Sequence, residues 1–250
     1  MKKNILNLCF ILISVIFYYG CSKDSTNDSD NTDNDINTID NEALYQSAIE
    51  DAIVADSAEI CDTLWAINAN NQNLLWKTIG AEQYVLVGSF TKYPDSYTDS
   101  LLTNWWGEIW VYIPTQFKRR MAGSIIQEED TLLRIRQLLG LPPSNTASNI
   151  VELWVKPADI FRPAADPEID DNTAGLYFGN DVDSSYKAWF NECIYDNYFG
   201  NGAHYPWTRL GYTYDWSRNS KETGVSEFCI KPNSVLYVNK LYTAKKYISN

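Results

Sequence analysis

The chain has 250 residues and carries 20 lysines and arginines, 32 aspartates and glutamates, one histidine and five cysteines, with a formal charge of −12. This acidic balance disfavours a nucleic-acid partner, because no basic field exists to displace counterions from a phosphate backbone. A single histidine also excludes zinc sites that need two imidazole ligands.

The first twenty residues have the layout of a secretory signal peptide. Lys2 and Lys3 give a positive start, and the apolar run 5–19 ends at Gly20 and Cys21. This run is shorter than the roughly 20 residues that a membrane-spanning helix needs. The segment resembles the signal sequence of bacterial lipoproteins, in which a small residue precedes a cysteine that is lipidated and becomes the mature N-terminus.

The resemblance implies that residues 1–20 are removed and that lipid on Cys21 attaches the protein to a membrane, at the outer membrane or cell surface. Ordinary secretion is the alternative. Residues 22–42 hold seven acidic residues and one lysine, and very few that would join a core. Such a segment does not offset its ordering entropy, so residues 21–42 are predicted to be a lipidated cysteine followed by a disordered acidic tether.

Residues 43–250 are predicted to form a single α+β domain. An apolar stripe over 44–53 predicts an opening helix, and further helices are predicted over 131–139 and after Asp183. Strands are predicted at 61–68, 83–91, 106–114, 150–156, 209–216, 224–230 and 235–242. The last two are predicted to pair as a hairpin. Together these elements give a mostly antiparallel or mixed sheet of about six to seven strands with about three helices.

Three cysteines remain in the predicted domain: Cys61, Cys193 and Cys229. A Cys193–Cys229 disulfide and buried free thiols both fit an oxidising compartment. A cysteine nucleophile would have to use His204, the only imidazole, and no local signature supports such a pair.

Carboxylates gather in the predicted connection 159–183. Hard oxygen ligands in one loop suit calcium, and the sequence indicates no other cofactor. The candidate ligands are Asp166, Glu168, Asp170 and Asp171. A solvated acidic loop without a ligand is the favoured interpretation.

The same carboxylates are candidate catalytic groups of an extracytoplasmic hydrolase. The candidates are Asp166, Glu168, His204 and Asp215. His204 with Asp215, or Asp215 with Glu227, would be alternative pairs, and two carboxylates are what acid–base cleavage of a glycosidic bond requires.

All nine tryptophans lie in the predicted domain. Four that neighbour polar or loop residues are expected to bind ligand by stacking. These are Trp105, Trp106, Trp207 and Trp216. Three others are expected to fill the core: Trp110, Trp154 and Trp189.

The leading hypothesis is therefore a lipid-anchored envelope protein that binds an extracellular glycan or protein, with binding favoured over catalysis. A hydrolase is the first alternative. An interaction subunit of an envelope complex, without a small-molecule site, is the second.

Overall fold

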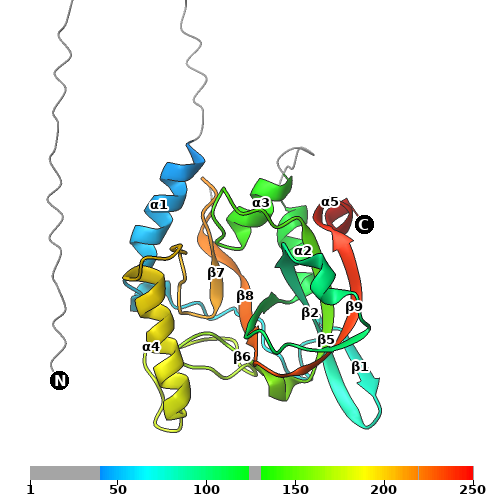
Figure 1. The fold of residues 1–250 in the computed structure, drawn as a ribbon. Helices are drawn as coiled ribbons and strands as arrows, with labels where there is room; N and C mark the ends of the chain where they lie inside the picture. Colours follow the sequence, from blue (N-terminus) through cyan, green and yellow to red (C-terminus); the bar gives the residue numbers. More distant parts are fainter. Residues whose placement is uncertain (1–39, 124–130, 219, 250) are drawn as a thin grey trace, which may run out of the picture. The chain divides into compact units, whose positions relative to one another are not determined.

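The computed structural model describes residues 40–123, 131–218 and 220–249. The predicted signal peptide, Cys21 and nearly all of the predicted tether lie outside the described residues. The described residues form one α+β domain with five helices and nine strands (Figure 1). None of these helices is both long and apolar enough to cross a bilayer.

The nine strands belong to one sheet, in which all pairings are antiparallel. They are β1 (Trp76–Ile79), β2 (Glu82–Thr91), β3 (Leu101–Thr103), β4 (Ile109–Tyr112), β5 (Asn149–Val155), β6 (Ile160–Phe161), β7 (Tyr212–Asp215), β8 (Glu222–Ile230) and β9 (Val235–Thr243). The order is β3-β9-β5-β2-β4-β8-β6, with β1 also paired to β2 and β7 to β8. The predicted class is confirmed, and the strand count exceeds the prediction.

The helices are α1 (Asn41–Ala52), α2 (Pro114–Ala122), α3 (Thr131–Leu138), α4 (Ser184–Tyr198) and α5 (Ala244–Ser249). Asp40 caps α1 by accepting hydrogen bonds from the amides of Glu42 and Ala43, at 3.1 and 3.0 Å. The helix therefore begins at Asn41, inside the segment predicted to be tether. Asp183 caps α4 as predicted, accepting from the Ser185 amide at 2.7 Å.

The sheet is apolar on both faces. On β4, Ile109 and Val111 belong to a core cluster on one face, whereas Tyr112 belongs to a second cluster on the other. This second cluster includes Phe117 of α2, Ile135 of α3 and Tyr247 of α5. Three helices thus cover the face to which Tyr112 points.

One predicted strand and the predicted hairpin are wrong. Residues 61–68 form an irregular connection and no strand. The amides of Leu64 and Ile67 donate isolated hydrogen bonds to the carbonyls of Asn172 and Ile169. The predicted hairpin is not formed, since β8 pairs with β4, β6 and β7 while β9 pairs with β3 and β5.

The side chain of Asn104 explains why the turn between β8 and β9 does not close a hairpin. Its amide nitrogen donates to the Lys231 carbonyl at 3.0 Å, and its oxygen accepts from the Ser234 amide at 2.7 Å. The turn is therefore tied to the β3–β4 connection, and the two strands that it joins diverge.

Helices α2 and α5 were not predicted. Pro114 had marked the end of a strand in the sequence, whereas in the structure it is the first residue of α2. Proline suits that position because its missing amide hydrogen would have no partner there.

Candidate functional site

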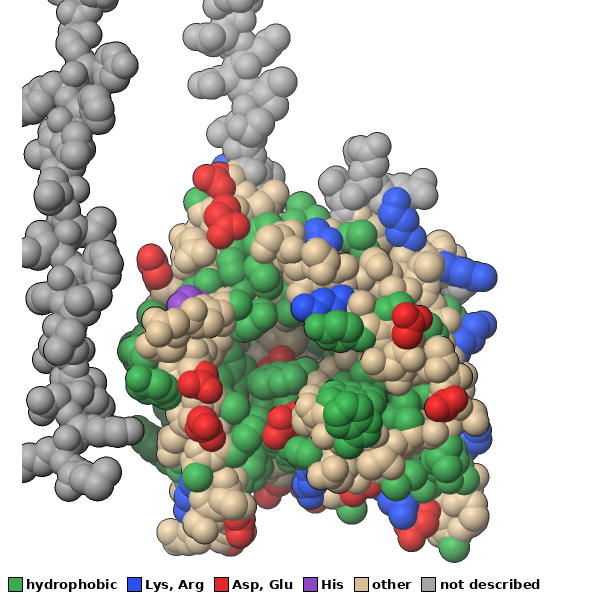
Figure 2. All heavy atoms as spheres, in the orientation of Figure 1, with side chains coloured by type: hydrophobic (Ala, Val, Ile, Leu, Met, Phe, Trp, Pro, Cys, Tyr) green, Lys and Arg blue, Asp and Glu red, His purple; other side chains and the backbone are tan. Residues whose placement is uncertain are grey.

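A pocket of about 600 Å³ opens between α4, the end of α3 and strands β4, β7 and β8. Figure 2 shows a hollow on this face of the molecule, surrounded mainly by hydrophobic side chains. Its lining is rich in aromatic residues: Phe90, Trp110, Tyr112, Tyr205, Trp207 and Tyr214. This volume lies within the range of sites that bind small ligands, which are mostly apolar with a few polar groups.

Glu227 of β8 places a carboxyl group in this apolar pocket. Its register partner on β4 is Tyr112, so both side chains point to the same face of the sheet. Protein atoms surround the carboxyl group, although it still borders the open volume of the pocket. This burial raises the pKa of Glu227 to about 8. The side chain therefore holds a proton over much of the neutral range.

No described residue forms a hydrogen bond or ion pair with the Glu227 carboxyl group, and no lysine, arginine or histidine lines the pocket. Two further polar atoms of the lining are buried without a hydrogen-bond partner among the described residues. They are the hydroxyl of Tyr112 and the indole nitrogen of Trp207. A buried polar group without a partner is costly, and two such groups belong to residues of this lining.

Two tryptophans form one wall of the pocket. The rings of Trp110 and Trp207 meet edge to face, with centroids 5.8 Å apart. Trp207 is 7% exposed, whereas Trp110 is 40% exposed. The prediction that Trp110 fills the core is therefore wrong: its ring stands at the pocket, on the face that β4 shares with Glu227 of β8. Trp154 and Trp189 are only partly buried.

The loop after α4 closes another side of the pocket and is held by hydrogen bonds. Asn197 donates to the Tyr205 carbonyl at 2.8 Å and accepts from the Tyr205 amide at 2.9 Å. The Tyr198 hydroxyl donates to the Trp207 carbonyl at 2.7 Å. His204 is fixed in the same loop, since its Nδ1 contacts the Asn197 carbonyl oxygen and its own carbonyl accepts from Tyr45.

The four tryptophans predicted to bind ligand do not share one surface. Trp207 lines the pocket, whereas Trp216 is 3% exposed and donates to the Leu141 carbonyl at 3.0 Å. Trp105 and Trp106 are exposed and meet edge to face at 5.8 Å, outside the pocket lining. Trp216 is therefore too buried to stack against a ligand at the surface.

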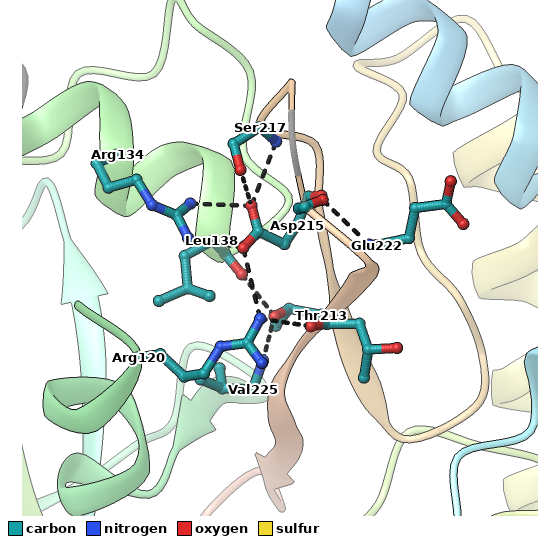
Figure 3. Close-up of polar contacts among 10 residues, drawn as sticks. Arg120, Arg134, Leu138, Thr213, Asp215, Ser217, Glu222 and Val225 are labelled. Carbon is teal, nitrogen blue, oxygen red and sulfur yellow. Dashed lines mark hydrogen bonds and ion pairs between the residues drawn. The ribbon is translucent and has the colours of Figure 1, made fainter. Parts of the chain in front are cut away.

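Asp215 is part of an ion pair rather than a catalytic pair (Figure 3). It is 1% exposed, and both carboxylate oxygens accept hydrogen bonds from Arg134 of α3, at 2.9 and 2.7 Å. Arg120 of α2 approaches from the other side at 3.6 Å. Asp215 forms no hydrogen bond with His204 in the described structure, so the predicted His204–Asp215 pair is not formed there.

Asp215 and Glu227 are also too far apart to act together. The register partner of Asp215 is Glu222, and Glu227 lies five positions further along β8. That is about 17 Å of strand, well beyond the separation of paired carboxylates in glycosidases. Of this predicted pair, only Glu227 borders the pocket.

The predicted acidic loop does bring three carboxylates together. Oxygen atoms of Asp166, Glu168 and Asp171 all lie within 4.8 Å of one another. Burial, followed by the charge of Asp171, raises the pKa of Asp166, and the charge of Asp166 raises that of Glu168. Asp171 is also bonded to the buried guanidinium of Arg162 at 2.7 Å. Asp170 lies outside this cluster.

The three cysteines of the domain are free thiols. Burial raises the pKa of Cys193 to about 11 and that of Cys229 well above its ordinary value. Thiols with raised pKa values are poor nucleophiles at neutral pH, because little thiolate forms. Neither thiol is hydrogen-bonded to His204 in the described structure, and the geometry gives no support to a cysteine–histidine enzyme.

Comparisons with known proteins do not indicate which ligand or reaction this pocket serves. No protein-family model matches the chain, and no match was found among curated proteins or solved structures. The pocket therefore has to be interpreted from its own chemistry.

Sequence reasoning considered Glu227 only as a partner of Asp215 and did not find the pocket. A signal for it exists in β8, where Val225, Glu227 and Cys229 share one face by the two-residue repeat. A single carboxylate on an otherwise apolar strand face is the pattern that marks the site.

Proposed function

We propose that this protein is a lipid-anchored cell-envelope protein whose α+β domain binds an extracellular ligand in the aromatic pocket beside Glu227. The ligand is a small molecule, or one group of a glycan or protein that fits into the pocket. The observation that carries the proposal is the pocket itself, which combines six aromatic side chains with a carboxyl group that lacks a protein partner. The N-terminal resemblance supports the envelope location.

A screen of small soluble fragments by ligand-observed NMR tests the binding proposal. Trp110→Ala removes one wall of the pocket, and Trp105→Ala is the matched control because that ring is 77% exposed and lies outside the lining. We expect fragments to bind the wild type and Trp105→Ala and to lose affinity for Trp110→Ala. Binding that depends on Trp105 and not on Trp110 would instead support the exposed tryptophans as the binding surface, and no binding by any fragment would contradict the proposal.

Metabolic labelling with a fatty-acid analogue tests the anchor. The wild type should be labelled and should sediment with membranes, whereas Cys21→Ala should lose the label because the acceptor thiol is gone. A Cys21→Ala protein that still carries label would rule out lipidation at this position.

The raised pKa of Glu227 favours one second function, a hydrolase in which this residue is the general acid. A carboxyl group that keeps its proton near neutral pH can protonate a leaving group. Asp196 also lines the pocket and would serve as the second carboxylate. Chromogenic nitrophenyl glycosides test this function: activity lost in both Glu227→Gln and Asp196→Asn would support it, and no hydrolysis of any glycoside would leave binding as the function.

A further inference from the structure

The charged side chains that line the pocket are all of one sign. Glu227 and Asp196 are the charged residues of its lining, which holds no lysine, arginine or histidine. Among the described residues, the Glu227 carboxyl group has no ion-pair or hydrogen-bond partner. An anionic ligand would therefore find no cation in the lining to compensate for the cost of its desolvation.

The aromatic side chains of the pocket also favour a cationic ligand. The face of an aromatic ring carries a negative partial charge, so it attracts a cation placed over it, and tryptophan attracts most strongly. Trp110, Trp207, Tyr205 and Tyr214 come from three separate parts of the chain and converge on the volume that Glu227 borders. Rings on several sides and one carboxylate are the combination by which proteins bind ammonium groups.

We propose that the pocket binds an organic cation, a ligand with an ammonium group and an apolar body, and that Glu227 is its counter-ion. This inference rests on the proposed binding function and names the class of ligand. The ammonium group lies against the Glu227 carboxylate and the faces of the rings, while the apolar body fills the remaining volume.

A neutral hydroxylated ligand is the principal competitor. The protonated Glu227 carboxyl group would donate a hydrogen bond to one of that ligand's oxygen atoms. The two ligand classes differ in what happens to the proton of Glu227. A cation is bound best by the carboxylate and displaces the proton, whereas a neutral ligand leaves the proton in place. The pH dependence of binding therefore separates them.

Several titratable groups line the pocket or interact electrostatically with Glu227, and they bear on that pH dependence. They are Tyr112 on β4, Tyr214 on β7, Cys229 on β8, Cys193, Asp196 and Tyr198 on α4, and Tyr205 in the following loop. Burial raises the pKa of Tyr198 to about 12 and that of Cys193 to about 11, and the pKa values of Tyr112, Tyr214 and Cys229 are also raised. These five groups stay protonated near neutral pH. His204 is in the same loop as Tyr205 and needs its own control.

The experiment measures binding of choline and of its neutral isostere, 3,3-dimethylbutan-1-ol, to the full mature chain by calorimetry or NMR titration. The two probes have the same shape and differ in charge. We expect choline to bind the wild type at least about tenfold more tightly at pH 8, the ratio that a single favourable ion contact provides. The apparent affinity for choline should rise about tenfold per pH unit between about pH 6 and pH 7, because the carboxylate fraction does.

Three variants sharpen the test. Glu227→Gln should lose both the preference for choline and the pH dependence, while it keeps the shape of the pocket. Trp110→Ala should weaken choline binding and keep its pH dependence, because Glu227 is still present. His204→Gln should retain the pH dependence, which assigns the titration to Glu227.

The results that would overturn the inference are distinct from those that would overturn the proposed function. Equal or tighter binding of the alcohol, choline binding that is independent of pH, or an unchanged preference in Glu227→Gln each exclude Glu227 as a counter-ion. Absence of choline binding excludes it as well. In all of these cases, fragments that still bind in a Trp110-dependent way leave the proposed pocket function standing.

Discussion

Arg134 binds both carboxylate oxygens of Asp215, at 2.9 and 2.7 Å, and so joins helix α3 to strand β7. Asp215 is 1% exposed and the Arg134 side chain 16% exposed, so this pair is largely removed from water. Removing one partner of a buried ion pair is strongly destabilising, because the other charge then stays buried without full compensation.

Asp215→Asn should therefore lower the free energy of unfolding by about 3 kcal/mol, because it removes the buried carboxylate charge that pairs with Arg134 and lies 3.6 Å from Arg120. Urea denaturation measures the change. Asp99→Asn is the matched control, because Asp99 is exposed and its charge is solvated. A loss no larger than that of the control would show that the pair contributes little.

Position 211 requires glycine, because of its backbone conformation and because another side chain lies very close to it. Its φ is +77°, and a Cβ atom there would lie 2.5 Å from Cδ of the fully buried Arg162. Gly211→Ala should destabilise the domain by about 3 kcal/mol, from left-handed strain and overpacking together. Gly175→Ala is the control, since a Cβ there has open space. Equal thermal midpoints for the two variants would contradict this expectation.

The pKa of Glu227 predicts how stability changes with pH. Burial raises it from 4.5 to about 8 on folding, so the native state binds more protons than the unfolded state between these values. The stabilisation from this group is complete below about pH 4.5 and is lost as the pH rises to about 8, with a slope of up to about 1.4 kcal/mol per pH unit. Glu227→Gln removes this slope.

Urea denaturation of the wild type and Glu227→Gln between pH 5 and pH 8 measures the effect, because contributions from all other groups cancel in the difference. Relative to the variant, the wild type should become progressively less stable as the pH rises. Parallel pH profiles would mean that Glu227 titrates near its ordinary value.

The carboxylate cluster in the acidic loop yields a prediction about calcium. One oxygen of Asp171 is already bonded to Arg162, which neutralises part of the negative charge that would attract an ion. We expect thermal midpoints in millimolar calcium and in EDTA to agree. A midpoint that rises with calcium in the wild type but not in Asp166→Asn would establish a calcium site here.

Local patterns were sufficient where a segment's structure depends on its own residues. The helix that begins after Asp183 and the strand predicted within 106–114 follow from capping and periodicity within a few residues, and both are present, as α4 and β4. The same reasoning failed where a residue distant in the chain determines the structure of a segment. Asn104 holds the turn after β8, and no property of residues 231–234 indicates that contact.

The site shows the same division. The sequence by itself determined the α+β class, the acidic character, and which residues carry reactive or stacking groups, because these depend on composition and short-range pattern. Only the tertiary structure decided their roles: Asp215 is neutralised by Arg134, Trp216 is buried, and Glu227 is left with Trp110 and Trp207 in a pocket without a cation. The reason is physical, because charge compensation and burial depend on neighbours that folding brings together from distant parts of the chain.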